Sequence, residues 1–180
     1  MNLYLVRHGQ DDESVRGGWC QHGLLEEGVT QSQCLGDELS NISFDIIFSS
    51  DLNRAIETTR VILSYQNKTE VHYTSELREI NNGLLSGMKH EEAEEKYPGL
   101  YYRTLDFDEK YPLGESPKEF YERVSQFFEK EIFNLKAENI LIITHGGVIN
   151  IVQHLLNNQI YSNKEVKYPI KTGSFVKLNK

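Results

Sequence analysis

Short apolar runs alternate with longer amphipathic segments along this chain, and this alternation limits the folds that it can adopt. Helical spacing of apolar side chains recurs between the runs, and Asp51 is in position to cap one of these helices. Strands that are apolar on both faces and alternate with helices are typical of a mostly parallel sheet. We therefore expect an α/β fold, a three-layer α/β/α sandwich. The expected strands cover residues 3–6, 44–48, 71–73, 140–143 and 174–178, and the expected helices cover about 26–39, 51–63, 116–135 and 148–156.

The length of 180 residues suits one domain with its own core and is too short for two ordinary domains. We expect a single domain over residues 1–180. Residues 81–114 lack the regular pattern, so we expect them to form a small cap inserted over the sheet. Tyrosines are frequent in and near this stretch, and they either line a pocket or form the cap's own small core. They are Tyr97, Tyr101, Tyr102, Tyr111 and Tyr121.

The charge balance and the apolar runs limit the partners of the protein. A formal net charge of −8 argues against a nucleic-acid surface, which needs a basic patch. The longest apolar runs, such as residues 140–143, are far too short to span a membrane, and a strand that starts at residue 3 leaves no room for a signal peptide. Cys20 and Cys34 are the only cysteines, which fits a reducing compartment. We expect a cytoplasmic protein that binds neither nucleic acid nor membrane.

Three of the predicted strands lead into residues of the same chemical kind. Arg7 and His8 follow the first run, Arg54 lies shortly after the second, and His145 and Gly146 follow the run at 140–143. Ligands bind at the carboxyl ends of strands in parallel α/β sheets, so these residues are expected to meet at one edge. Singly, His145 is more simply a structural histidine and Arg54 a solvated charge. Their combination at three strand ends is hard to explain by packing alone.

The chemistry of these residues fits a phosphate group. Two arginines provide planar guanidinium groups that match phosphate oxygens, and two histidines provide a nucleophile and a partner near neutral pH. Gly146 stands where a helix begins, and its exposed backbone N–H group suits an anion. Nearby arginines should lower the pKa of His8 and keep its imidazole neutral and able to attack.

Six short motifs follow one another along nearly the whole chain. They are LVRHGQ at 5–10, LLEEG at 24–28, SSDLNRA at 49–55, LRE at 77–79, GES at 114–116 and THGG at 144–147. Their order and span resemble those of the histidine phosphatases, also called the phosphoglycerate-mutase-like superfamily. The resemblance implies a phosphomonoesterase that hydrolyses a small phosphorylated metabolite through a phosphohistidine, without a metal or another cofactor.

The resemblance also implies a role for individual residues. His8 would be the nucleophile, and Glu79 would donate a proton to the leaving oxygen and then activate water. Arg7, Arg54 and His145 would hold the phosphoryl group. The remaining positions expected to bind phosphate are Gln10, Ser14 and Gly146. Gln10 stands where the family commonly has glutamate, and Ser14 stands where an asparagine often contacts phosphate.

Some features leave other functions open. The acidic residues 11–13 should weaken phosphate binding or select the substrate, which keeps a non-catalytic module that binds a phosphorylated ligand as an alternative. A phosphoglycerate mutase is a second alternative, although mutases carry a longer insertion between the donor glutamate and the second histidine. His90 begins a sequence like the zinc motif HExxH, but Glu94 occupies the position of its second histidine, so no zinc helix is expected. The oligomeric state is not predicted by the sequence.

Overall fold

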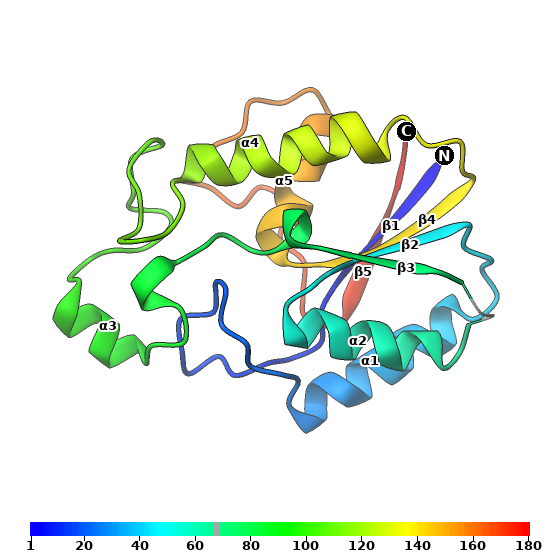
Figure 1. Ribbon diagram of the computed structural model, residues 1–180, viewed down its shortest axis with the longest axis horizontal. Coiled ribbons are helices and arrows are strands. Elements are labelled where there is room, and N and C mark those ends of the chain that lie inside the picture. The colour runs from blue at the N-terminus through cyan, green and yellow to red at the C-terminus, as the bar shows by residue number, and fades with distance from the viewer. Residues whose placement is uncertain (67–68) are drawn as a thin grey trace.

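The computed structural model describes residues 1–66 and 69–180, and its centre is one five-stranded sheet (Figure 1). The strands lie side by side in the order β3-β2-β4-β1-β5. β5 runs antiparallel to β1, whereas the other neighbouring pairs are parallel, which confirms the mostly parallel sheet. The strands are β1 (Asn2–Arg7), β2 (Ile46–Ser50), β3 (Val71–Thr74), β4 (Asn139–Thr144) and β5 (Ser174–Asn179).

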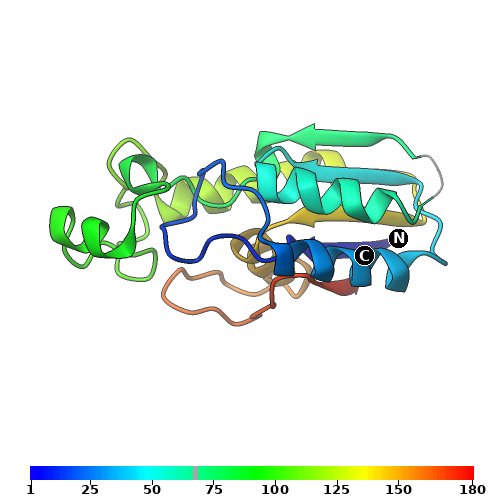
Figure 2. The ribbon, with the colours of Figure 1, turned by 90° about the horizontal axis from the view of Figure 1, so that it is seen from below.

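Helices cover both faces of the sheet, as the predicted three-layer sandwich requires. In Figures 1 and 2, α1 and α2 lie on one face, and α4 and α5 lie on the other. Within the described residues, no helix has both the length and the apolar character needed to cross a membrane. The helices are α1 (Glu26–Leu39), α2 (Asn53–Leu63), α3 (His90–Lys96), α4 (Pro117–Phe127) and α5 (Gly146–Leu156).

Alternate side chains of each central strand point to opposite layers. In β1, Tyr4 and Val6 belong to the apolar cluster that includes α1 and α2, whereas Leu3 and Leu5 belong to the cluster of α4 and α5. All four side chains are buried. This period of two explains why the central strands are apolar throughout, because both of their faces are covered.

The start of α4 agrees with the sequence prediction, whereas the predicted cap of α2 does not. The Ser116 side chain accepts a hydrogen bond from the Glu119 N–H group, and the Glu119 carboxylate accepts one from the Ser116 N–H group, so a capping box fixes the start of α4. α4 itself ends at Phe127 and continues as one π-helical turn to Ile132, which is shorter than expected. The expected cap of α2 is wrong. Asp51 forms an ion pair with Arg78 instead, and Leu52 precedes the helix.

The segment 81–114 lies beyond the carboxyl ends of the strands and contains α3 (Figure 2). Its apolar side chains do not form a separate core. Leu85, Ala93 and Leu105 are fully buried and belong to the same cluster as the α4 and α5 side of the sheet. The cap is therefore packed continuously with the main core, which limits its freedom to move as a separate unit.

Two glycines let the backbone after β1 approach the first turn of α1. A Cβ atom on Gly9 would lie 2.3 Å from the carbonyl oxygen of Gly28, and one on Gly28 would lie 2.2 Å from the carbonyl oxygen of Gln10. Both obstructing atoms belong to the backbone, which cannot rotate away as a side chain can. The glycine of the RHG motif is therefore required by packing next to His8.

We predict that replacing Gly9 with alanine lowers the free energy of unfolding by about 1–3 kcal/mol, because the added methyl group forces two backbone segments apart. Urea unfolding followed by circular dichroism measures the change. Gly17 is the matched control, since no atom lies within 4 Å of a Cβ built there. Its replacement by alanine should change the free energy of unfolding by less than about 0.5 kcal/mol. Equal effects of the two substitutions would contradict the packing argument.

Candidate active site

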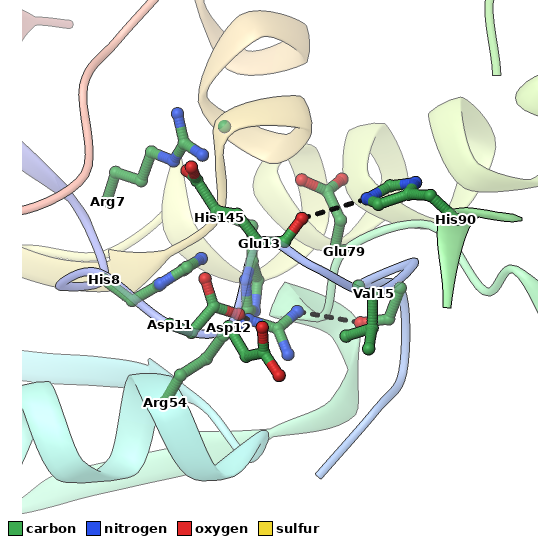
Figure 3. Close-up of a pocket in the computed structure, with 13 residues that line it drawn as sticks. Arg7, His8, Asp11, Asp12, Glu13, Val15, Arg54, Glu79, His90 and His145 are labelled. Carbon is green, nitrogen blue, oxygen red and sulfur yellow. Dashed lines mark hydrogen bonds and ion pairs between the residues drawn. The ribbon is translucent and has the colours of Figure 1, made fainter. Parts of the chain in front are cut away.

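Residues from three strand ends line one cavity of about 320 Å³ at the carboxyl edge of the sheet (Figure 3). Arg7 ends β1 and His8 follows it, Arg54 lies in the first turn of α2 after β2, and His145 lies between β4 and α5. Glu79 reaches the same cavity from the segment after β3, and Gly146 from the start of α5. The structure thus brings together six of the eight residues that the sequence singled out.

The two histidines lie next to each other in the buried part of this cavity, with their ring planes tilted by 57°. Their ring centroids are 4.9 Å apart, and His8 and His145 are almost fully buried. His8 Nδ1 lies 2.8 Å from the carbonyl oxygen of Gly9, which can only accept a hydrogen bond. The proton of a neutral His8 therefore resides on Nδ1, and Nε2 keeps its lone pair. His145 Nε2 lies 2.9 Å from the hydroxyl oxygen of Ser50.

Both imidazoles are held neutral near pH 7. Burial lowers the pKa of His8 from 6.5 to about 3, and the positive charges of Arg54 and Arg7 add to this effect. Burial and then Arg54 hold the pKa of His145 well below its usual value. The arginines thus have the effect on His8 that the sequence predicts, although burial is the larger cause. A neutral His8 can offer Nε2 as a nucleophile.

Backbone carbonyl groups orient the two arginines of the cavity. Arg54 donates from Nη2 to the Gly18 carbonyl at 2.8 Å and from Nη1 to the Cys20 carbonyl at 3.1 Å. Arg7 donates from Nη1 to the Ile170 carbonyl at 2.7 Å. Carbonyl groups fix the guanidinium planes without cancelling their charge. The cavity therefore keeps positive charge that suits a phosphoryl group.

The carboxylate of Glu79 is fixed by backbone N–H groups. Its Oε2 accepts a hydrogen bond from Gly147 at 3.0 Å, and its Oε1 accepts one from Ile80 at 3.1 Å. A Cβ atom on Gly147 would lie 2.2 Å from Glu79 Oε1, so glycine is needed for this close approach. The main-chain carbonyl of Glu79 accepts hydrogen bonds from Trp19 Nε1 at 2.8 Å and Arg123 Nη2 at 3.2 Å.

Arg123 and Glu115 connect this segment to α4. Arg123 forms two hydrogen bonds with the Glu115 carboxylate, at 2.7 and 2.9 Å, and also donates to the carbonyl groups of Glu76 and Arg78. Sequence analysis missed Arg123, because an arginine within an amphipathic helix is expected to be a solvated charge. The GES motif around Glu115 is the signal that could have led to it. Arg123 positions the backbone that carries Glu79.

Two predicted phosphate contacts have no support in this geometry. Gln10 does not line the cavity, and its Oε1 accepts a hydrogen bond from Thr172 Oγ1 at 2.9 Å. Ser14 is exposed and also lies outside the lining residues. His90, to which the sequence assigned no role, lines the cavity and lies 3.0 Å from the carbonyl oxygen of Glu13. Among residues 1–66 and 69–180, no group of His, Cys, Asp and Glu side chains is arranged to hold a metal ion.

A larger cavity of about 800 Å³ adjoins the first. The two cavities share Arg7, Glu79, His90 and Gly146 among their lining residues. The walls of the larger cavity are rich in aromatic rings, so three of the predicted tyrosines line a pocket, whereas Tyr97 and Tyr121 pack against the core. The tyrosines that line it are Tyr101, Tyr102, Tyr111, Tyr161 and Tyr168.

Asp11 is a carboxylate inside the phosphate-sized cavity. Its Oδ2 lies 3.4 Å from Arg54 Nε, in an ion pair that is largely buried. Burial raises the pKa of Asp11, and Arg54 opposes this rise. The acid therefore competes with an incoming anion for Arg54, as the acidic run at residues 11–13 suggested.

We predict that Asp11→Asn tightens the binding of inorganic phosphate about fivefold, because it removes the charge that competes for Arg54. Isothermal titration calorimetry measures the affinity. Asp12→Asn removes the same charge from a neighbouring carboxylate, which accepts a hydrogen bond from the Ser14 N–H group. It should change the affinity by less than about twofold. Equal gains in both variants would mean that only net charge matters.

Comparison with known proteins agrees with the order of motifs and with the geometry. The family model of the histidine phosphatase superfamily (branch 1) matches residues 3–179. The chain is 36% identical over 156 residues to a 2,3-bisphosphoglycerate-dependent phosphoglycerate mutase of Parvibaculum lavamentivorans, over 81% of this chain and 74% of that one. It is 30% identical over 165 residues to a broad-specificity phosphatase of Saccharomyces cerevisiae, over 84% of this chain and 68% of that one.

A solved structure shows the same fold. The alpha-ribazole phosphatase from Shigella flexneri superimposes with a TM-score of 0.88 at 26% identity, over 99% of this chain and 90% of that one. The match of the family model over nearly the whole chain, together with these relatives, is sufficient for assignment. This chain belongs to the histidine phosphatase superfamily (branch 1).

Proposed function

We propose that this protein is a phosphomonoesterase that hydrolyses a small phosphorylated metabolite through a phosphohistidine on His8. The observation that carries the proposal is the position of Glu79. Its side chain lies in the smaller cavity with Arg7 and Arg54 (Figure 3), and the same residue also lines the larger aromatic cavity. A phosphoryl group bound beside His8 would place its leaving group in the larger cavity. Glu79 then stands where the bond to the leaving oxygen breaks.

The first step is attack by His8 Nε2 on phosphorus. The N–P bond forms while the bond from phosphorus to the leaving oxygen breaks, and Glu79 supplies the proton that this oxygen needs. Arg7, Arg54 and His145 surround the equatorial oxygens, whose charge grows in the transition state. The two guanidinium groups are already oriented by carbonyl groups, so little reorganisation is needed at this stage.

The second step returns His8 to its neutral form. Glu79, now ionised, takes a proton from a water molecule that attacks the phosphohistidine, the N–P bond breaks, and inorganic phosphate leaves. The positive charge of Arg7 and Arg54 provides the stabilisation that a divalent ion provides in many phosphoryl-transfer enzymes. We therefore propose a reaction without a metal. The free Cys20 and Cys34 favour a reducing cytoplasm as the place of this reaction.

A phosphoglycerate mutase is the second candidate, because the relative from Parvibaculum lavamentivorans carries that name. A mutase returns the phosphoryl group from His8 to a substrate hydroxyl, whereas a phosphatase passes it to water. Residues 80–144 between Glu79 and His145 comprise the cap, α4, the π-helical turn and β4 in this chain. The resemblance implies a longer insertion between the corresponding residues of a mutase, which favours the phosphatase. Release of free phosphate separates the two reactions.

We predict that the wild-type protein, in excess chelator, releases inorganic phosphate from members of a panel of metabolite phosphomonoesters. Labelled substrate quenched in alkali should leave an acid-labile, alkali-stable phosphoenzyme. His8→Ala should abolish the phosphoenzyme and lower turnover by about 10⁴-fold or more. The control His22→Ala changes an exposed histidine outside the cavity and should keep both signals.

Three results would contradict this assignment in different ways. Transfer between substrate hydroxyls without net phosphate release would identify a mutase. Phosphate binding without turnover of any panel member would identify a binding module. Activity lost in chelator and restored by a divalent ion would overturn the metal-independent mechanism.

The role of Glu79 predicts a dependence on the leaving group. Glu79→Gln should slow phosphorylation of His8 by a sugar phosphate about 10²–10⁴-fold, because an alkoxide needs a proton to leave. It should slow phosphorylation by an activated aryl phosphate far less, since the phenolate leaves unaided. Arg54→Ala is the matched comparison and should slow both esters by similar factors, because both present the same phosphoryl oxygens. Rapid-quench kinetics measure the rate of the phosphorylation step for each ester. Equal slowing of both esters by Glu79→Gln would show that another group is the acid.

A further inference from the structure

Arg16 is a buried arginine that the mechanism above does not use. It lies in the loop between β1 and α1, is 8% exposed and lines the larger cavity. Its guanidinium carbon lies 3.7 Å from the centre of the Tyr101 ring, which covers one face of the cation. Its backbone is fixed by hydrogen bonds with the carbonyl group of Met88 and the N–H group of Gly87. The side chain is therefore held in place beside the cavity.

The guanidinium group of Arg16 lacks a polar partner within the described part of the chain. Its Nε and Nη2 atoms are buried there without a hydrogen bond, and none of the ion pairs in residues 1–66 and 69–180 includes Arg16. The carboxylate of Glu94 accepts hydrogen bonds from the Tyr101 hydroxyl and the Gly99 N–H group. These bonds and, to a smaller extent, the charge of Arg16 lower the pKa of Glu94, but the two side chains form no ion pair. A buried cation without a directly paired counter-ion is costly, so its retention beside a cavity points to an anion that is supplied from outside.

Among the described charged side chains that line the larger cavity, Arg16 is the one that is buried and does not also line the phosphate cavity. Arg7, Glu79 and His90 also line the phosphate cavity, whereas the remaining charged side chains, those of Arg103 and Glu165, are exposed. Aromatic rings form much of the rest of the wall. An anionic substituent on the leaving group would thus meet one preoriented guanidinium group in surroundings of low polarity.

The loop that carries Arg16 is tied to the phosphate site. Arg54 donates hydrogen bonds to the carbonyl groups of Gly18 and Cys20, only two and four residues after Arg16. Gly17 and Gly18 line both cavities. The spacing between the two anion-binding positions is therefore set by the fold before a ligand arrives, which lowers the cost of binding two anions at once.

We propose that Arg16 is a specificity-determining residue that binds a second anionic group, a carboxylate or a phosphate, on the leaving part of the substrate. The inference rests on the proposed function, because it assigns the larger cavity to the leaving group. It narrows the substrate class to phosphomonoesters that carry a second anion.

Binding to matched ligand pairs tests this role without turnover. In the His8→Ala background, calorimetry compares 3-phosphoglycerate with glycerol 3-phosphate, which differ by a carboxylate in place of a hydroxymethyl group. A second pair, propane-1,3-diol bisphosphate and its monophosphate, tests a phosphate in the same role. We expect the member with the second anionic group to bind about tenfold tighter or more in at least one pair, and the pair that shows the preference identifies the anion.

Arg16→Gln in the same background should remove this preference. Arg103→Gln is the matched control, because it removes an equal charge from an exposed lining residue and should reduce the preference by less than about threefold. Arg16→Lys keeps the charge but not the planar fork and should retain part of the preference. If circular dichroism shows that Arg16→Gln is unfolded, Arg16→Lys against Arg103→Lys carries the comparison.

Two results would overturn the inference: no preference for the second anion in either pair, or a preference that survives Arg16→Gln unchanged. Failure of the proposed function gives a different pattern. A wild-type protein that turns over no phosphomonoester but whose anion preference depends on Arg16 would refute hydrolysis and leave the binding role of Arg16 standing.

Discussion

Positive charge that is buried and oriented mainly by backbone carbonyl groups is the constraint on which the rest of this site depends. Arg54 is 2% exposed, and its Nη atoms donate to the backbone carbonyl groups of Gly18 and Cys20. Carbonyl groups orient a guanidinium group without neutralising it, and the carboxylate of Asp11, 3.4 Å from Arg54 Nε, offsets part of the charge of Arg54. Burial, with the charge of Arg54 as a second cause, lowers the pKa of His8 and keeps its imidazole neutral. Nucleophile and anion site are thus consequences of one arrangement.

This arrangement requires distant segments to lie against the sheet edge. The loop after β1 supplies carbonyl groups to Arg54, and Ile170 near the other end of the chain supplies one to Arg7. The close contact between Gly9 and Gly28 packs the backbone directly after His8 against the first turn of α1. Asp11 differs from these carbonyl groups, because its carboxylate carries a negative charge near Arg54 and competes with an incoming anion for this arginine.

The cap determines what lies next to the phosphate site. Its buried side chains, including Leu85 and Leu105, share a core with the α4 and α5 side of the sheet, so the aromatic cavity has a fixed wall. Glu79 lies between the two cavities because Gly147 leaves room for its carboxylate. Arg123 holds the backbone of the same segment from α4. Cap, donor segment and sheet edge therefore form one packed unit.

Much of this could be predicted from the sequence because the signals are local. Side-chain periodicity reveals strands and helices, since a strand alternates every two residues and a helix every 3.6. Residues such as His8 and His145 directly follow strands, so the strand ends place them at one edge. The same reasoning failed for Asp51, the predicted cap of α2, because its carboxylate forms an ion pair with Arg78 instead. A local capping pattern could not reveal that competing long-range partner.

The sequence by itself determined the five strands and the helices α1, α2, α4 and α5, but not α3, which lies in a segment without a regular pattern. It also determined the three-layer packing and the meeting of the RHG, arginine and second-histidine motifs, because these follow from periodicity and from motif order. Only the tertiary structure decided the surroundings of Arg16 and the hydrogen bond from Arg123 to the Glu79 carbonyl. It also decided that Gln10 accepts a hydrogen bond from Thr172 and does not line the cavity. Each of these depends on loops that pack across the edge of the sheet. Their neighbours are far away in the chain, and no local pattern encodes which carbonyl, ring or hydroxyl a folded loop will present.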